Sequence, residues 1–318
     1  MSYILHGVTL ALAWFLVVNA AISAIVAAVA RRLMARDAAM SPGFWFSLRL
    51  LPCMAAMVFV AALFLPSYWR YEPREFVEGF DVTLTALAAI ALLIVAASSA
   101  RGLLAWRSAI RRADAWMRTA RPLPIGDAGM AAFAIEEDAP LMALVGVLRP
   151  RLFVARGLLD ALTAEELAAS VAHEAGHRRA WDNLKRLAMR AAPDLLAITG
   201  IARGIERRWA SASEHAADRR AAGDGPTRCA LASALVKVAR LTPPMTPLAE
   251  PISTLVDGGE IASRVERLLD DGTPAPARHR AVGVWLAVAI PAAVLAAGYT
   301  PLLQVVHAAT EILVNGLP

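Results

Sequence analysis

The chain has 318 residues, of which 58% are hydrophobic and 19% charged, and its mean hydropathy is +0.52. With only two cysteines, one in an apolar stretch and one in a polar region, it has no disulfide framework. Arginines beside apolar stretches explain the net charge of +5 and the pI near 9.7. Since no phosphate-binding glycine loop or nucleic-acid motif stands out, we expect no nucleic-acid partner.

Four apolar stretches approach the length of about 20 residues that an α-helix needs to cross a bilayer. In chain order they are residues 4–30, 44–65, 82–100 and 282–306. Any one of them could be a buried core helix, but a soluble protein of this length would seldom need four. The sequence therefore predicts a mainly α-helical integral membrane protein with four transmembrane helices and the lipid bilayer as a partner.

The arginines predict the orientation of these helices. The first loop carries Arg31, Arg32 and Arg36 against one acidic residue, whereas residues 66–81 carry two arginines against four acidic residues. Arginines also follow the third stretch and precede the fourth. Because cytoplasmic loops are enriched in Lys and Arg, the first loop and the long segment before the fourth stretch are predicted to be cytoplasmic. Both termini are then external.

This pattern predicts three parts in a plasma membrane of the bacterial type. Residues 1–100 hold three transmembrane helices, residues 101–280 form a cytoplasmic domain, and residues 281–318 form the last transmembrane helix with a short external tail. Arg49 lies near the cytoplasmic start of the second stretch. Its long side chain can extend to the membrane interface, so we assign it no function.

Residues 101–121 allow two interpretations. Leu103, Trp106, Ile110 and Met117 recur at helical spacing, and arginines fill much of the rest. Such a segment suits a helix that lies on anionic lipid. It equally suits a helical extension of the third transmembrane helix, and the sequence does not decide between them.

Short apolar runs follow, at residues 131–135, 141–147 and 151–154, divided by acidic and proline-containing segments. This alternation predicts a small antiparallel β-meander. One of its edge strands could hold an extended peptide by backbone hydrogen bonds, or the sheet could simply support the next helix.

The next helix carries His173-Glu174-Ala175-Gly176-His177. The segment 163–166, Thr-Ala-Glu-Glu, is a capping box, so the helix should begin near Ala164. Histidines at positions i and i+4 lie on one face and can bind one tetrahedral ion. Glu174 can then sit beside a metal-bound water as a general base, because zinc lowers the pKa of that water to about 7. The alternative is a helix whose histidines are ordinary surface or core residues.

A second helix, predicted at residues 201–222 and ended by Gly223, argues against that alternative. Its Glu214 and Asp218 are again four residues apart. Glu214 is the best candidate for the third metal ligand, and Asp218 for a carboxylate that orients His173. No glycine or histidine continues the first motif after His177, which excludes a three-histidine site of the extended type.

Several motifs together resemble the membrane metallopeptidases of the BlaR/MecR type, which transduce beta-lactam signals. They are LRPRLFV at 148–154, GLL at 157–159, LTAEEL at 162–167, HEAGH at 173–177 and WDN at 181–183. HEAGH and the Glu-x-x-x-Asp of residues 214–218 are also similar to HtpX-like and CAAX-prenyl membrane proteases. The resemblance spans about residues 140–222, with a weaker echo at 264–269.

The resemblance implies a gluzincin-like domain with one Zn²⁺ ion, held by His173, His177 and Glu214. It implies Glu174 as the catalytic base and Asp218 as the residue behind a zinc histidine. His215 has no counterpart and points about 100° away from its neighbour Glu214, so it is only a candidate oxyanion donor. Asp182 is expected to pair with a nearby arginine.

The expected activity is that of a membrane-bound zinc metalloendopeptidase. Its substrate would be a protein or peptide, such as a cytoplasmic repressor or another membrane protein, and signal transduction is the expected role. Protein quality control in the membrane is one alternative, and a non-proteolytic sensor or scaffold that keeps the zinc fold is another. The sensors of the BlaR/MecR type carry an external penicillin-binding domain, for which this chain has no segment of sufficient length.

Overall fold

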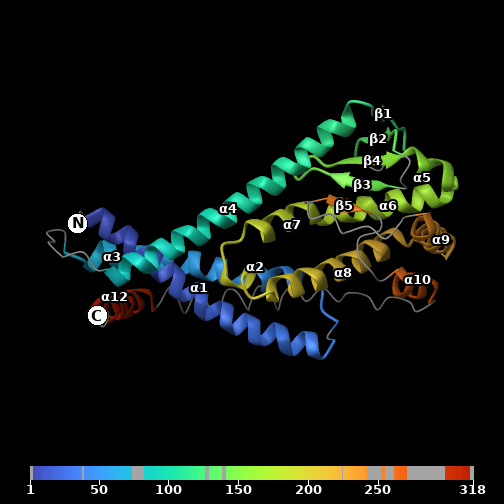
Figure 1. Cartoon of the computed structure of the whole chain (residues 1–318). Helices are drawn as coiled ribbons and strands as arrows, with labels where there is room; N and C mark the ends of the chain where they lie inside the picture. Colours follow the sequence, from blue (N-terminus) through green and yellow to red (C-terminus); the bar gives the residue numbers. More distant parts are fainter. Residues whose placement is uncertain are drawn as a thin grey trace.

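The computed structural model describes residues 3–37, 39–73, 82–125, 129–137, 141–223, 225–241, 252–254, 261–270 and 298–315. Its helices form an elongated molecule with two different ends (Figure 1). Both termini and helices α3 and α12 lie at one end, whereas the β-sheet and helices α6, α9 and α10 lie at the other. The first end belongs to a narrow half and the second to a broad half.

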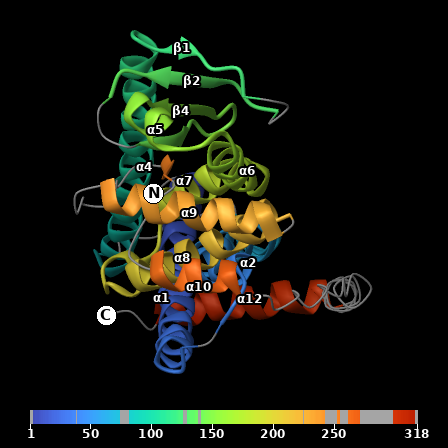
Figure 2. The ribbon, with the colours of Figure 1, turned by 90° about the vertical axis from the view of Figure 1, so that its right-hand side faces the viewer.

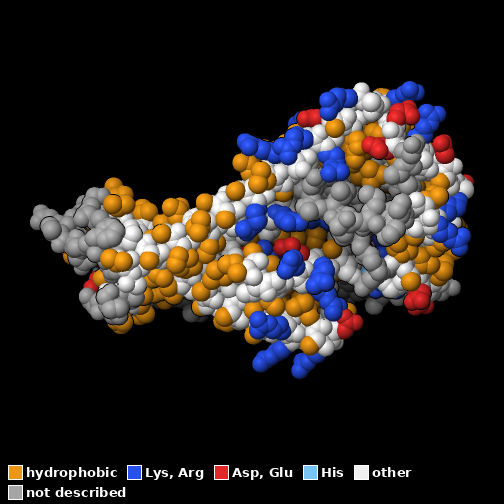
Figure 3. All heavy atoms as spheres, viewed as in Figure 1, with side chains coloured by type: hydrophobic (Ala, Val, Ile, Leu, Met, Phe, Trp, Pro, Cys, Tyr) orange, Lys and Arg blue, Asp and Glu red, His pale blue; other side chains and the backbone are white. Residues whose placement is uncertain are grey.

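Long apolar helices build the narrow half. They are α1 (Tyr3–Ala35), α2 (Pro42–Phe59), which continues through the π-helical turn η1 (Val60–Phe64) into α3 (Leu65–Tyr71), and α4 (Val82–Met117). Within the described ranges, three helical segments are long and apolar enough to cross a membrane: Tyr3–Ala35, Pro42–Tyr71 and Val82–Met117. Hydrophobic side chains cover much of this half, and Lys and Arg gather where it widens (Figure 3). The first three predicted transmembrane helices are therefore present as helices.

The fourth predicted transmembrane helix, at residues 282–306, lies mostly outside the described residues. Where the description resumes, α12 (Tyr299–Asn315) runs beyond residue 306, so the segment predicted as a tail is helical as far as Asn315. This helix packs against α3 through Ser67, whose hydroxyl donates to the carbonyl of Leu303 at 2.7 Å.

Helix α4 decides between the two interpretations of residues 101–121. It is continuous to Met117, so the extension of the third transmembrane helix is confirmed. Its last turns do not lie free on a surface, because Ala109 is buried against the sheet residues Ile135 and Phe153. The ring of Trp116 lies 5.3 Å from that of Phe153. The helix thus carries the sheet on its far end (Figure 1).

The sheet is mixed, and the prediction of an antiparallel meander is wrong. Its strands are β1 (Arg121–Pro122), β2 (Ala132–Ile135), β3 (Met142–Val145), β4 (Arg151–Ala155) and β5 (Ile252–Thr254), in the order β1-β2-β4-β3-β5. Strand β2 pairs in parallel with β4, whereas β3 and β4 form an antiparallel hairpin. Residues 152–155 of β4 are completely buried, because β2 and β3 pair with its two edges and apolar clusters pack on both of its faces. An antiparallel meander would leave β4 at an edge.

Strand β5 pairs antiparallel with β3. Strand β3 therefore has neighbours on both sides, and β1 and β5 form the two edges of the sheet. Binding of an extended peptide at an edge strand stays a prediction. The sequence indicated neither β1 nor β5. Strand β5 comes from a segment almost 100 residues further along the chain than β4, and short-range alternation cannot reveal such a pairing.

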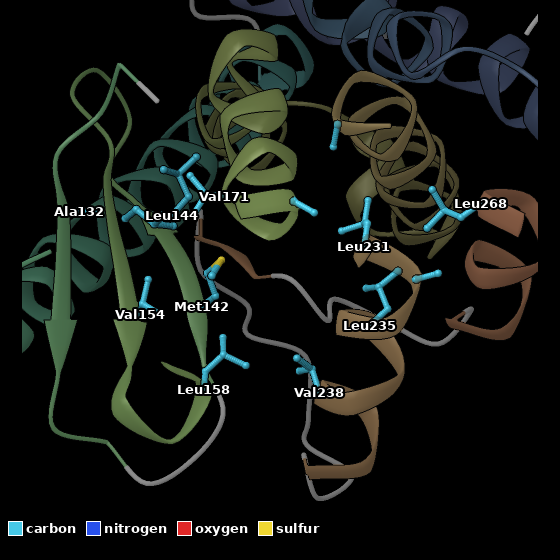
Figure 4. Close-up of a cluster of buried hydrophobic side chains, with 14 residues drawn as sticks. Ala132, Met142, Leu144, Val154, Leu158, Val171, Leu231, Leu235, Val238 and Leu268 are labelled. Carbon is cyan, nitrogen blue, oxygen red and sulfur yellow. The ribbon is translucent and has the colours of Figure 1, made fainter. Parts of the chain in front are cut away.

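The remaining helices include the one that carries the HEAGH motif. They are α5 (Arg156–Ala161), α6 (Ala164–Ala180), α7 (Asp182–Ala191), the 3₁₀ turn η2 (Leu195–Ala197), α8 (Ile201–Ala221), α9 (Gly225–Leu241) and α10 (Ile261–Leu269). One core joins the sheet to α6, α9 and α10 (Figure 4). Met142 and Val154 face Val171 of α6, Leu235 of α9 and neighbouring apolar side chains across it. Seen from this end, α9 lies between the sheet and α10 (Figure 2).

Arg49 does not extend to a membrane interface, and that expectation is wrong. Its side chain is 2% exposed and is paired with Asp194 and with Glu206. The guanidinium lies beside these two carboxylates inside the protein because α2 packs directly on α8. Both cysteines are free, with Cys53 buried and Cys229 exposed.

The predicted capping box begins α6 at Ala164. The Thr163 hydroxyl accepts from the Glu166 amide at 3.3 Å, and the Glu166 carboxylate accepts from the Thr163 amide at 2.8 Å. The same carboxylate accepts from Ser233 and Lys237 of α9 at 2.6 and 2.7 Å. Burial raises the pKa of Glu166, but these hydrogen bonds outweigh it and hold the pKa below the usual 4.5.

We expect Glu166→Gln to lower stability by about 1–3 kcal/mol at neutral pH, because Lys237 loses a charged acceptor. The folded-state pKa is lowered, so the stabilisation is present above pH 4.5 and is lost as the pH falls through the folded pKa. The difference in the free energy of unfolding between wild type and Glu166→Gln should therefore shrink on acidification. Thermal unfolding at several pH values measures this difference, with the exposed Asp160→Asn on α5 as control. A difference that grows on acidification would contradict the assignment.

Candidate metal centre

Helix α6 places His173, Glu174 and His177 in the interior. All three side chains are at most 1% exposed. The two Nε2 atoms lie 3.1 Å apart, so both imidazoles converge on one point, as the spacing of i and i+4 predicts. The helix stops at Trp181, which adopts a left-handed conformation with φ 59°.

Helix α8 brings Glu214 to the same point. The helices approach closely, since a Cβ atom on Gly176 would lie 3.3 Å from the Cα atom of Ala217. Oxygens of Glu214 lie 3.4 Å from Nε2 of His173 and 3.3 Å from Nε2 of His177. The structure therefore brings the three predicted ligands together.

This triangle fits a tetrahedral zinc ion. With bonds of about 2.0–2.1 Å, two ligand atoms of such an ion lie about 3.3 Å apart. The two Nε2 atoms lie 3.1 Å apart, and the two oxygens of Glu214 lie 3.4 Å (Oε2 to His173) and 3.3 Å (Oε1 to His177) from them. The charges fit as well. Four buried carboxylates, those of Glu174, Asp182, Glu214 and Asp218, meet one buried arginine and two histidines. A divalent cation would offset this excess of negative charge.

Glu174 lies between the two histidines and is completely buried. Neither of its carboxylate oxygens has a hydrogen-bond partner among the described residues. Burial raises the pKa of Glu174, whereas the neighbouring histidines lower it less strongly. A carboxylate with free oxygens and a raised pKa is suited to accept a proton.

Each histidine has a carboxylate behind it. Asp218 Oδ1 lies 2.9 Å from Nδ1 of His173, where the sequence placed it. Asp182 Oδ2 lies 2.8 Å from Nδ1 of His177 and accepts a 2.5 Å hydrogen bond from Ser213. These contacts leave both Nε2 atoms directed at the metal position.

Asp182 was expected to pair with an arginine, and this expectation is wrong. Its partners are His177, Ser213 and Lys185. The left-handed Trp181 breaks the helix, so that Asp182 begins α7 and turns back toward His177. The WDN motif at 181–183 was the part of the sequence that pointed to this role of Asp182. Its last residue, Asn183, fixes the start of α7 by donating to the carbonyls of Leu144 and Gly146 at 2.9 Å.

Arg264 of α10 also reaches the centre, and sequence reasoning missed it. It donates to both oxygens of Asp218 at 2.7 and 2.8 Å and lies 3.1 Å from Glu214. Its side chain is only 5% exposed. The resemblance at 264–269 was the available signal, but nothing in the sequence connected α10 with the ligands.

The carboxylates set the protonation of the histidines. Burial lowers the pKa of His177, but Glu214 and Asp182 outweigh it and raise the pKa to about 10. The pKa of His173 is raised in the same way, against burial, by Asp218 and Glu214. The pKa of Glu214 is held well below its usual value, since His177 and His173 outweigh the effect of burial.

His215 turns away from this cluster. Its Nδ1 lies 3.3 Å from the guanidinium of Arg267 on α10, and His215 does not belong to either group of described residues whose atoms could hold a cation. Another group whose atoms could hold a cation is Glu72, His307 and Glu311. That group is partly exposed, whereas His173, His177 and Glu214 are all buried.

We expect Asp182→Asn and Asp218→Asn each to weaken zinc binding about 10- to 100-fold, since each removes the carboxylate that orients a histidine. Competition with a chelator on the purified protein measures this affinity. The exposed Asp160→Asn on α5 is the control and should bind zinc as wild type does. Equal affinities of all four proteins would refute the roles given to Asp182 and Asp218.

Residues 113–256 match the family model described as Peptidase family M48. The matched segment is less than half of the chain, contains the three candidate ligands and Glu174, and ends before Arg264. Among the curated proteins no match is found. The match supports a metallopeptidase, and the three apolar helices support a membrane protein. The finer resemblance to the beta-lactam sensors stays a prediction.

Proposed function

We propose that this chain is a membrane-bound zinc endopeptidase that cuts peptide bonds in a cytoplasmic regulator or in membrane proteins at the inner surface. One observation carries the proposal: the buried triangle of His173, His177 and Glu214, beside which the carboxylate of Glu174 has no hydrogen-bond partner among the described residues. The match to a peptidase family over this segment supports it.

His173, His177 and Glu214 would hold the ion. When bound, zinc would lower the pKa of a coordinated water to about 7 and polarise the scissile carbonyl. Glu174 accepts a proton from the attacking water and passes it to the leaving nitrogen. Asp182 and Asp218 keep both histidines in place, and Arg264 offsets the charge of Glu214 and Asp218.

The cytoplasmic placement of the site rests on the arginines. Lys and Arg gather where the apolar half of the molecule widens into the half that holds α6 and α8 (Figures 1 and 3). Cytoplasmic borders of membrane proteins are enriched in these residues. Substrates would then come from the cytoplasm or from the inner face of the membrane.

Cells that carry wild type or Glu174→Gln test the proposal. Comparative proteomics should find new protein termini on the cytoplasmic side that depend on the intact Glu174. Identical sets of termini, with both proteins present in the membrane and loaded with zinc, would favour a non-proteolytic sensor or scaffold instead. Termini confined to damaged membrane proteins would indicate quality control, and termini in one regulator would indicate signalling.

A further inference from the structure

Arg49 joins a membrane helix to three other parts of the molecule. From α2 it donates through Nε to Glu206 of α8 at 2.9 Å and through Nη2 to the carbonyl of Met189 on α7 at 3.0 Å. Its Nη1 is hydrogen-bonded to Asp194, directly before η2. Every nitrogen of the guanidinium thus has a partner on a segment that follows the HEAGH helix.

Burying the charges of Arg49 and Asp194 costs desolvation energy. The side chains of Arg49 and Asp194 are 2% and 0% exposed. Removing one member of a buried ion pair is generally strongly destabilising, whereas an apolar pair at the same place is often no less stable. Packing of α2 on α8 alone therefore does not require the arginine, and its directional contacts fix one position of α8 against α2.

Helix α8 has two halves with different neighbours. In its first half, Ala202, Ile205 and Trp209 are buried together with Val26 of α1 and Leu48 of α2. In its second half, the buried face carries Ser213, Glu214, Ala217 and Asp218 toward α6. Glu206 and Glu214 are eight residues apart in one uninterrupted helix, about 12 Å along its axis.

The position of α8 decides the geometry of the candidate metal centre. Glu214 is the one ligand that does not come from α6, so its distances of 3.3 and 3.4 Å to the histidines depend on how α8 lies. Functional sites must hold such geometry to about 0.5 Å. A shift of α8 by even a fraction of a helical turn would remove Glu214 from the triangle.

We propose that Arg49 is a positioning residue for the metal centre. Its ion pair with Glu206 sets α8, and with it Glu214, relative to the membrane helix α2. Because α2 belongs to a segment that can cross a membrane, a displacement of that helix is transmitted through Arg49 and α8 to Glu214. The site is thereby coupled to the state of the membrane helices, and this coupling rests on the function proposed above.

A double-mutant cycle on the full-length protein in detergent tests the proposal. Arg49→Met, Glu206→Gln and the double variant are loaded with Co²⁺, whose visible absorption reports the ligand geometry, and with zinc, whose affinity is measured by competition. We expect each single variant to change the Co²⁺ spectrum and to weaken zinc binding about tenfold. The double variant should be no worse than either single one, since the two residues act as one pair.

Leu48→Ala is the matched control, because Leu48 is buried in the same interface on the same helix. It should lower the unfolding temperature and leave the Co²⁺ spectrum unchanged. If Arg49→Met does not fold, the Glu206→Gln variant by itself tests the proposal, because Arg49 keeps its ion pair with Asp194 in that variant. Wild-type spectra and affinities in Glu206→Gln would reduce Arg49 to a structural role.

The metal readouts separate this inference from the proposed function. A wild type that binds zinc but cleaves no peptide would overturn the function and leave the positioning role to be decided by the cycle. A wild type that cleaves, with Glu206→Gln unchanged in metal binding, would overturn only the positioning role. Failure of the wild type to bind metal would overturn both.

Discussion

Glu174→Gln is expected to abolish measurable peptide cleavage while the protein keeps its zinc. The change preserves the size of the side chain but removes the group that takes the proton, and general-base catalysis typically contributes about 10²–10⁴-fold. The carboxylate is not needed for folding contacts, since its oxygens have no hydrogen-bond partner among the described residues. Stability should therefore be close to that of wild type.

The measurement is kcat/KM on a fluorogenic peptide, with zinc content determined on the same preparation. Glu165→Gln is the control, because Glu165 is an exposed glutamate in the first turn of the same helix. A Glu174→Gln protein that keeps zinc and cleaves at the wild-type rate would rule out the mechanism. One that has lost zinc would show that Glu174 contributes to holding the metal.

Local sequence patterns predicted the two helices of the centre well. The capping box at Thr163 begins α6 at Ala164, as predicted, and α8 runs from Ile201 to Ala221, one residue short of the predicted end. Spacing of four residues places His173 and His177 on one face, and Glu214 and Asp218 on another. These features depend on helix geometry alone, and that geometry is the same in every protein.

Contacts between distant segments were beyond such patterns. Arg49 meets Glu206 across 157 positions in the chain, and Arg264 meets Asp218 across 46. An arginine near an apolar stretch suggests a membrane interface, because nothing local reveals a buried carboxylate on another helix. The parallel pairing of β2 with β4 was missed for the same reason, since alternation identifies a strand but not its neighbour.

Arg264→Met is expected to lower stability by about 3–5 kcal/mol, because it leaves Glu214 and Asp218 buried without their arginine. Burial lowers the pKa of Arg264, but Asp218 and Glu214 outweigh this effect and raise the pKa. The arginine is therefore charged at neutral pH. Thermal unfolding in detergent, with and without zinc, measures the loss.

Arg267→Met is the matched control, on the same helix and one turn further on. Arg267 is exposed and contacts Ser263 and His215, so its loss should change stability by less than about 1 kcal/mol. Equal losses of stability in the two variants would show that Arg264 does not stabilise the metal centre. A large effect of Arg264→Met alone would mean that the centre is completed by a residue beyond the segment that matches the peptidase family, so that α10 is required to hold the charges of the site together.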